Sequence, residues 1–172
     1  LSTTGTAAIV EFPGVLYRGG AEQKIRKYLI DNNYVDAVIQ LPSNLFFGTT
    51  IATCIIVLKK SKTDNAVLFI DASAEFVHVG NKNKLSEANR EKILDAYVAR
   101  RDIDHFARLV PNKDIAENEY NIAVSSYVEQ NNETEKVDIK KLNAHIAEIV
   151  IRQQKLREAI DEIVADLEGG TA

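Results

Sequence analysis

The chain has 172 residues, of which 45% are hydrophobic and 27% are charged. This length corresponds to about one domain, and the composition excludes wholesale disorder because enough apolar side chains are present to form a core. The net charge of −4 excludes a molecule covered in positive charge, although a local basic patch could still contact nucleic acid. A single cysteine excludes a disulfide framework and a cysteine-cluster metal site, and three scattered histidines argue against a histidine-rich one.

The longest stretch without a charged residue runs from Ala37 to Leu58. It is long enough to span a bilayer, but Pro42, Gly48 and several polar residues interrupt it, which argues against a membrane helix. No charged-then-apolar signal segment opens the chain. We therefore expect a soluble protein of a reducing compartment, the cytoplasm, with no membrane partner.

The sequence contains no methionine, and a strand-like run begins only a few residues from its first residue. Natural proteins usually begin with Met and often with an irregular polar end. We therefore interpret the chain as a fragment of a longer protein.

Apolar runs separated by turn residues predict an α/β sheet domain over residues 1–73. The expected elements are strands at residues 6–12, 34–41, 52–58 and 66–70 and a helix at residues 21–30. Strand, helix and strand within about 35 residues predict a βαβ unit, whose two strands form a parallel pair. The short polar link at residues 59–65 predicts that the last two strands are antiparallel neighbours. We therefore expect a mixed sheet with an antiparallel hairpin at one edge.

The composition changes after this sheet, and residues 74–128 are expected to form a helical and loop extension. Residues 76–85 are expected to be a polar loop, and Ser86 is placed to cap a helix that runs to Ala99. Short helical pieces are expected on both sides of Pro111, at residues 102–110 and 112–118. Residues 129–137 are polar and predict a linker.

Residues 138–168 carry the most regular pattern in the chain. Seam positions recur at alternating steps of three and four residues over four heptads, and only Gln153 among them is polar. This spacing predicts one long amphipathic helix, roughly 43 Å long at about 1.5 Å per residue. Val150 and Val164 widen the apolar stripe, which suits a helical bundle better than a two-stranded zipper. The seam positions expected to dock on another helix are Leu142, Ile146, Ile149, Gln153, Leu156, Ile160 and Ile163.

Two features near the predicted helix at residues 21–30 are candidates for anion binding. The first, Arg18-Gly19-Gly20, precedes the helix, so its backbone could approach a phosphate. The alternative is a tight turn between strand and helix. The chain contains neither of the phosphate-binding motifs GxGxxG and GxxxxGK[ST]. The second is a basic cluster, and it is either a solvated helix face or a contact for a nucleic-acid backbone. Its members are Arg18, Lys24, Arg26 and Lys27.

A loop with two adjacent aromatic residues, Phe46 and Phe47, joins two of the predicted strands. Successive residues in an extended segment point to opposite sides, so at most one of the pair is easily buried. The other is a candidate for exposure at the strand ends, where α/β sheets bind their ligands. The alternative is that both rings fill the core. Cys54 lies in a Val/Ile-rich run and is most simply a core residue.

Long ordered runs of this sequence resemble the M subunits of type I restriction–modification systems. They are GTAAIVEFPGVLYRGGAE (residues 5–22), KIRK (24–27), DAVIQLPSNLFFGT (36–49), TCIIVLKK (53–60), FIDAS (69–73) and ENEYNI (117–122). The resemblance covers nearly the whole chain up to about Val128, and the length of the runs makes it specific. One departure is Glu11-Phe12-Pro13, where the family often has Leu-Pro-His.

That family consists of adenine-N6 DNA methyltransferases that use S-adenosylmethionine. The resemblance implies that the chain is the C-terminal part of their Rossmann-like sheet, mixed and with an antiparallel edge hairpin, followed by an α-helical extension ending in a long amphipathic helix. The family's glycine-rich cofactor loop and Asn-Pro-Pro-Phe/Tyr motif lie N-terminal to the region covered, and the three prolines here are unpaired. We expect no catalytic, cofactor-binding or metal-binding residue in this chain, and no activity from it alone.

The resemblance also implies roles for residues of this sequence. In the family's relatives an aromatic just before the second strand of the edge hairpin contacts the flipped target base; Phe46 matches it best and Phe47 second. The basic cluster is expected on the DNA backbone, and the long helix on the DNA-specificity subunit, with a restriction subunit as a further partner. Two alternatives stay open, namely a purely structural assembly module and an unrelated α/β domain with a coiled-coil tail.

Overall fold

The computed structural model describes residues 1–130 and 139–169. The chain divides into two compact units, Leu1–Asn131 and Asn132–Ala172. In the second unit the described side chains are those of residues 143, 146–161, 163 and 164.

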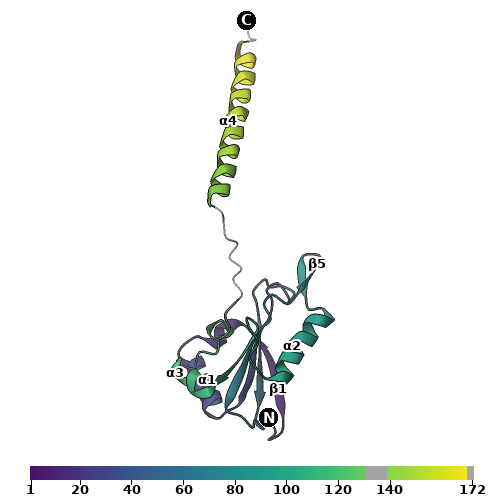
Figure 1. The fold of residues 1–172 in the computed structure, drawn as a ribbon, viewed down its shortest axis with the longest axis vertical. Coiled ribbons are helices and arrows are strands. Elements are labelled where there is room, and N and C mark those ends of the chain that lie inside the picture. Colours follow the sequence, from purple (N-terminus) through teal and green to yellow (C-terminus); the bar gives the residue numbers. More distant parts are fainter. Residues whose placement is uncertain (131–138, 170–172) are drawn as a thin grey trace. The chain divides into compact units, whose positions relative to one another are not determined.

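Within residues 1–130, the first unit is built on a five-stranded mixed sheet (Figure 1). Its strands are β1 (Thr6–Glu11), β2 (Val35–Gln40), β3 (Cys54–Lys59), β4 (Ala66–Asp71) and β7 (Ala107–Pro111). Their order across the sheet is β1-β3-β2-β4-β7; β2 and β4 pair in parallel, and the other neighbours are antiparallel. The sheet is mixed as expected, but it has antiparallel pairs toward both edges rather than one.

The strand order corrects two expectations. β1 and β2 run in the same direction but are not a hydrogen-bonded pair, because β3 lies between them and pairs with both. β3 and β4 are not neighbours, because β2 lies between them. The link between β3 and β4 crosses the start of β2, where Lys62 Nζ donates to the Val35 carbonyl over 2.6 Å. A short link therefore brings two strands close without making them adjacent.

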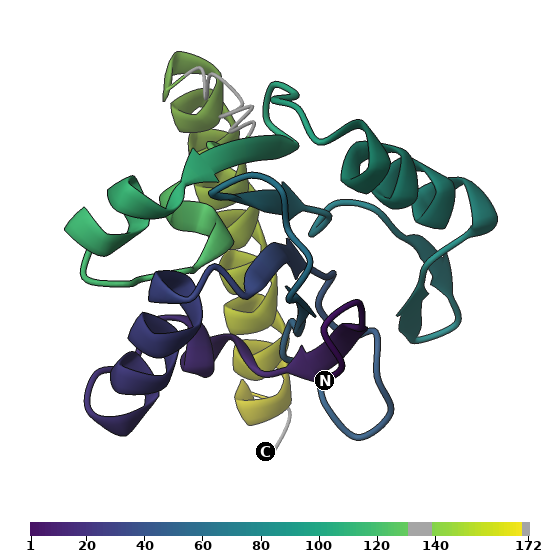
Figure 2. The ribbon, with the colours of Figure 1, turned by 90° about the horizontal axis from the view of Figure 1, so that it is seen from below.

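Helices cover both faces of the sheet (Figures 1 and 2). They are α1 (Ala21–Asp31) and α3 (Asn112–Glu117) on one face, with short 3₁₀ helices at Pro13–Leu16 and Val124–Ser126, and α2 (Glu87–Ala99) on the other. Ile30 of α1 and Ile115 of α3 pack with Phe69 of β4 in one buried core. Ala96 of α2 packs with Ile39 and the rest of a second core on the opposite face. The two faces are therefore closed by segments far apart in the sequence.

α2 begins where the sequence predicts. The Ser86 hydroxyl accepts from the Asn89 amide (3.2 Å), and the Asn89 side-chain oxygen accepts from the Ser86 amide (3.0 Å). This reciprocal pair is a capping box, which satisfies amides that the first helical turn leaves free. The helix ends at Ala99 and is capped by Arg100, whose φ of 50° lies in the left-handed region.

The fully described residues 74–128 contain three strands that the sequence did not predict. The expected loop at residues 76–85 is a hairpin of β5 (Val77–Val79) and β6 (Lys82–Lys84), which turns at Gly80 with φ of 61°. The expected helical piece at residues 102–110 contains most of β7, which pairs with β4. β5 and β6, of three residues each, are too short for an alternating pattern to be distinct. The piece at residues 112–118 is confirmed as α3.

The described part of the second unit is a long helix, α4 (Ile139–Gly169), as the heptad pattern predicts. The described apolar seam side chains, Ile146, Ile149, Leu156, Ile160 and Ile163, are between 49% and 59% exposed. Gln153 is exposed as well. The side chain of Leu142, and residues 131–137 of the expected linker, lie outside the described residues. Across the described parts of the chain, no helix is both long enough and apolar enough to span a membrane.

Candidate nucleic-acid interface

The loop between β2 and β3 starts at the carboxyl end of the parallel pair of strands. Gln40 at the end of β2 lies opposite Asp71 at the end of β4, and the Ala72 amide donates to the Gln40 carbonyl (2.9 Å). On the loop, Phe47 is fully exposed and Phe46 is 40% exposed. The two rings therefore do not both fill the core; they lie on the surface beside the strand ends, where α/β sheets bind ligands.

Lys82 of β6 holds this loop from the side. Its Nζ donates to Asn44 Oδ1 (2.8 Å) and to the backbone carbonyls of Phe46 (3.1 Å) and Thr49 (3.3 Å). An ammonium group has three protons, so these three acceptors match its full capacity. The loop and the hairpin are thus joined through one side chain.

Asn44 makes the reciprocal contacts from the loop. Its φ is 54°, a left-handed conformation that asparagine tolerates better than most residues. Its amide donates to the Thr50 carbonyl (3.1 Å), which closes the loop, and its Nδ2 donates to the Asn81 carbonyl (2.7 Å). Asn83 donates through its amide to the Asn44 carbonyl (3.1 Å) and through its side chain to the Ser43 carbonyl (2.8 Å). Sequence reasoning missed these contacts because they join segments about 38 residues apart.

Further apolar side chains are exposed on the same two segments. Ile51 of the loop is 58% exposed, and Val77 and Val79 of β5 are 43% and 57% exposed. Exposed apolar side chains on a fixed loop and hairpin are typical of a binding surface.

Arg26 of the basic cluster is not available to DNA. It is 4% exposed. Its guanidinium donates to the carbonyls of Tyr120 (2.8 Å) and Val15 (2.8 Å). The residue therefore ties α1 to two other segments, and the expectation that it binds a phosphate is corrected.

The other three basic residues are accessible. Arg18 lies 3.7 Å from Glu22, with 66% of its side chain exposed. Lys24 is exposed, and Lys27 donates to Asp31 (2.9 Å) and to the Tyr120 hydroxyl (2.6 Å) from an exposed position. These residues can still reach a nucleic-acid backbone.

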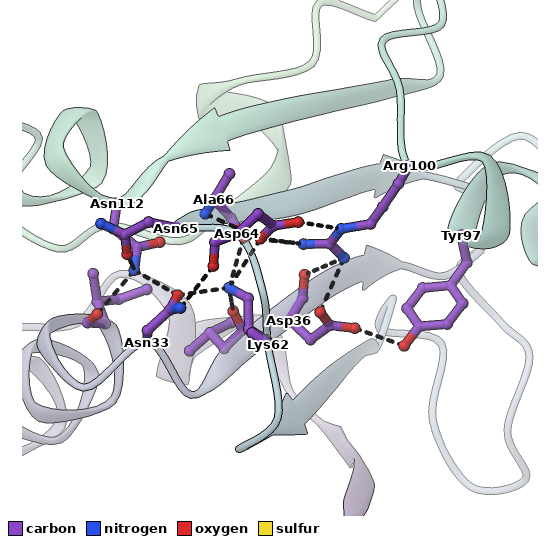
Figure 3. Close-up of polar contacts among 11 residues, drawn as sticks. Asn33, Asp36, Lys62, Asp64, Asn65, Ala66, Tyr97, Arg100 and Asn112 are labelled. Carbon is purple, nitrogen blue, oxygen red and sulfur yellow. Dashed lines mark hydrogen bonds and ion pairs between the residues drawn. The ribbon is translucent and has the colours of Figure 1, made fainter. Parts of the chain in front are cut away.

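A second polar cluster lies at the opposite, amino end of the parallel strands (Figure 3). The Lys62 side chain, which is 2% exposed, donates to Asn33 Oδ1 (2.9 Å) and to the carbonyls of Val35 (2.6 Å) and Ala66 (2.6 Å). Burial lowers the pKa of Lys62 to about 8. Because its three protons are directed at fixed acceptors, Lys62 holds the β3–β4 link in place rather than meeting a substrate.

Arg100 completes this cluster (Figure 3). It donates to Asp36 Oδ1 (2.9 Å) and to both carboxylate oxygens of Asp64 (2.8 and 3.0 Å). Asp36 also accepts from the Tyr97 hydroxyl (2.6 Å). Burial and this hydrogen bond raise the pKa of Tyr97 to about 12. The cluster fastens α2 and the β3–β4 link to the sheet, and its role is structural.

We expect Arg100→Ala to lower the free energy of unfolding by about 2 to 3 kcal/mol, because it leaves the buried Asp36 carboxylate without its cation. The Asp36 side chain is 4% exposed, so water cannot fully replace the lost partner. The matched control is Arg101→Ala, an exposed neighbour whose loss should change stability by less than about 0.5 kcal/mol. Urea unfolding followed by circular dichroism measures both, and equal effects would show that the cluster contributes nothing specific.

The described residues contain no group of three His, Cys, Asp or Glu side chains able to hold a metal ion. Cys54 is fully buried in β3, and burial raises the pKa of its thiol to about 11. A thiolate is the reactive form of cysteine, so Cys54 is a core residue and not a nucleophile.

A protein-family model described as N-6 DNA Methylase matches residues 1–136. The chain belongs to the N-6 DNA methylase family. It is 51% identical over 168 residues to the type I restriction enzyme MpnII methylase subunit of Mycoplasma pneumoniae, covering 97% of this chain and 31% of the relative. It is 38% identical over 167 residues to the MjaVII methylase subunit of Methanocaldococcus jannaschii, covering 94% of this chain and 28% of that one. The chain thus spans less than a third of the length of these two relatives.

Solved structures agree with this assignment. The crystal structure of a type I restriction–modification methyltransferase subunit from Streptococcus thermophilus has a TM-score of 0.71 and 50% identity, over 73% of this chain and 27% of that one. The EcoKI M protein has a TM-score of 0.62 over 99% of this chain and 42% of that one, at 15% identity, which shows a likeness of fold alone. The alternative of an unrelated α/β domain is therefore excluded.

Proposed function

We propose that the chain is the C-terminal part of the modification subunit of a type I restriction–modification system, an S-adenosylmethionine-dependent DNA adenine-N6 methyltransferase. The observation that carries this proposal is the exposed pair Phe46 and Phe47, fixed beside the carboxyl ends of β2 and β4 in a chain of the N-6 DNA methylase family. An enzyme that methylates a base must first extrude it from the duplex, and aromatic faces stabilise the unstacked base. The loop then supplies the target-base side of the site.

Phe46 is our first choice for the stacking ring, and Phe47 is the second. The backbone carbonyl of Phe46 is held by Lys82 (3.1 Å), and its ring is partly packed at 40% exposure. A ring held in this way loses little conformational freedom when a base stacks on it. Phe47 is fully exposed and must be ordered on binding.

Three exposed basic residues before and on α1, Arg18, Lys24 and Lys27, are proposed to contact DNA phosphates. Phosphate contacts supply affinity and register, and they carry no sequence information of their own. This proposal leaves the choice of DNA sequence to a separate specificity subunit.

We infer that the outer edge of β1 pairs with further strands of a Rossmann-like sheet in the parent protein. Within the described residues its outer edge is unpaired, and Ile9 and Val10, which point to opposite faces, are 42% and 51% exposed. An apolar groove lined by residues of β1, β2, β3 and α2, among them Ala8, Ile55 and Ile93, lies on one of these faces. An unpaired apolar edge favours pairing with another strand. The cofactor loop and catalytic motif of the family would belong to that part of the parent, which would bind S-adenosylmethionine.

The exposed seam of α4 supports a role in assembly. We propose that it docks as an amphipathic helix on helices of the specificity subunit, and that DNA and a restriction subunit complete the complex in the cytoplasm. The second candidate function is a purely structural assembly module, which the same seam favours. The two differ in whether the aromatic loop contributes to methyl transfer.

We expect the chain alone to transfer no methyl group and to bind S-adenosylmethionine negligibly, because the family's cofactor loop and catalytic motif have no counterpart in it. Isothermal titration calorimetry with the cofactor measures this directly. The full-length modification subunit, titrated in the same buffer, is the matched control and should bind. A one-to-one micromolar complex with the isolated chain would contradict the prediction.

The reaction itself tests the proposal. The full-length subunit, assembled with its specificity subunit, is incubated with DNA and S-adenosylmethionine carrying a labelled methyl group. After digestion of the DNA to nucleosides, the label should be found in N6-methyl-2′-deoxyadenosine. Label in methylcytosine, or none in DNA that the complex binds, would overturn the proposed activity.

A further inference from the structure

We infer that Lys82 and Asn44 form a clamp that positions the Phe46–Phe47 loop for the target base. We call this pair the Lys82–Asn44 clamp. The inference rests on the proposed function of the loop and adds to it the residues that make the loop competent. Both are positioning residues, because they act through the aromatic rings rather than by touching the base.

The need for a clamp follows from the loop itself. It spans the residues between Gln40 and Cys54, which is longer than the 2–5 residues of common hairpin loops. Gly48 adds a left-handed φ of 80°, and neither aromatic ring is buried. A loop of this kind samples several conformations unless contacts from elsewhere restrict it.

The clamp supplies those contacts on both sides of the rings. Lys82 Nζ binds Asn44 Oδ1 before the aromatic pair and the Thr49 carbonyl after it, and it also binds the carbonyl of Phe46 itself. Asn44 Nδ2 in turn binds the Asn81 carbonyl at the hairpin turn (2.7 Å). The path of the backbone on both sides of the two rings is therefore tied to one strand.

The hairpin has little other role in packing. All three residues of β5 are exposed, whereas Asn83 of β6 is 8% exposed and bonds Ser43 and Asn44 of the loop. The hairpin thus directs its polar contacts to the loop and adds little to the core. Support of the aromatic loop is the function that these contacts fit.

The consequence for the reaction is measurable. Stacking stabilises an extruded base only when the ring is held where the base arrives, and displacement of a positioning group by about 1 Å can cost about 100-fold in rate. Loss of the clamp should therefore reduce the fraction of extruded base and slow methyl transfer by about 10- to 100-fold. Binding of S-adenosylmethionine should be unchanged, because the cofactor loop belongs to another part of the parent.

Two variants remove the clamp in the full-length subunit assembled with its specificity subunit. Lys82→Met keeps the aliphatic stem and deletes the three donors. Asn44→Gly deletes both side-chain contacts without backbone strain, because glycine readily adopts the φ of 54° found here. The matched control is Lys84→Met, which removes the same charge from an exposed position on the same strand.

Three quantities are measured for each variant. The first is the single-turnover methylation rate on a duplex that the complex methylates. The second is the fluorescence of the same duplex with 2-aminopurine in place of the target adenine, which reports base extrusion, and the third is S-adenosylmethionine affinity by calorimetry. We expect both clamp variants to lose rate and fluorescence together at unchanged cofactor affinity, with Lys84→Met equal to the wild type. Phe46→Ala and Phe47→Ala are measured alongside.

The outcomes separate the two hypotheses. If a phenylalanine variant is impaired while Lys82→Met and Asn44→Gly are not, the clamp is wrong and the proposed loop function stands. If neither phenylalanine variant is impaired, the loop function is wrong and the clamp with it. If cofactor affinity falls with the rate in both clamp variants, the contacts maintain the fold at large, and the positioning role is overturned.

Discussion

Replacing Leu156 and Ile160 together with aspartate should abolish association of the methylase subunit with its specificity subunit. The two side chains are 59% and 57% exposed on α4 and lie four residues apart, so they share one face of the helix. In a helix–helix interface both new carboxylates would be desolvated without partners, which costs several kcal/mol for each charge. Co-purification of the two full-length subunits measures the effect, and circular dichroism of the variant subunit checks its folding.

The opposite face of the same helix provides a matched control. Gln154→Asp with Glu158→Asp gives two aspartates at the same spacing, turned by about 200° from the seam, and adds one negative charge because residue 158 is already acidic. Both positions are exposed, and Gln154 Nε2 donates to Glu158 Oε1 (3.1 Å) along this face. This variant should retain the complex. Undiminished association of the Leu156 and Ile160 double variant would show that α4 packs elsewhere, and the docking role would be withdrawn.

Phe46→Ala in the full-length enzyme should lower productive DNA engagement by about 5- to 150-fold, the equivalent of about 1–3 kcal/mol of base–aromatic stacking. The physical cause is the loss of the ring face on which an extruded base would lie. The methylation rate and the affinity for the substrate duplex are the measurements. Phe46→Tyr keeps an aromatic face and should retain most activity, whereas Phe46→Leu keeps apolar volume without that face and should resemble Phe46→Ala.

Three results would change this assignment. If Phe47→Ala loses activity while Phe46→Ala stays active, Phe47 and not Phe46 is the stacking ring. Full activity of both alanine variants would remove the loop from the target-base site. Full activity of Phe46→Leu would show that apolar bulk, and not stacking, is what the position supplies.

Elements with a strong local pattern were predictable from the sequence. The apolar run at β4 marks a strand that is buried on both faces, and Ser86 marks the start of α2 through its capping box. The alternating steps of three and four residues predict α4 as a single helix. Each of these signals is contained within the element itself.

Features that depend on distant parts of the chain were not predictable in this way. The insertion of β3 between β1 and β2 is decided by packing across the sheet, and no local pattern encodes it. Arg26 looks like a member of a charged helix face, yet it is buried because it meets the Tyr120 carbonyl 94 residues away. From the sequence, Lys82 looks like a solvated residue of a polar loop. Its three acceptors lie on another segment, so the local sequence does not reveal them.

The central claim is that the Phe46–Phe47 loop faces the extruded target base, and photocrosslinking tests it most directly. The full-length complex is bound to a duplex with 5-iodouracil in place of the target adenine and is irradiated, digested with trypsin and analysed by mass spectrometry. Tryptic cleavage after Lys27 and Lys59 yields one peptide that contains both phenylalanines. We predict that the crosslink maps to Phe46 or Phe47 within it. A crosslink confined to other peptides of the complex would contradict the claim.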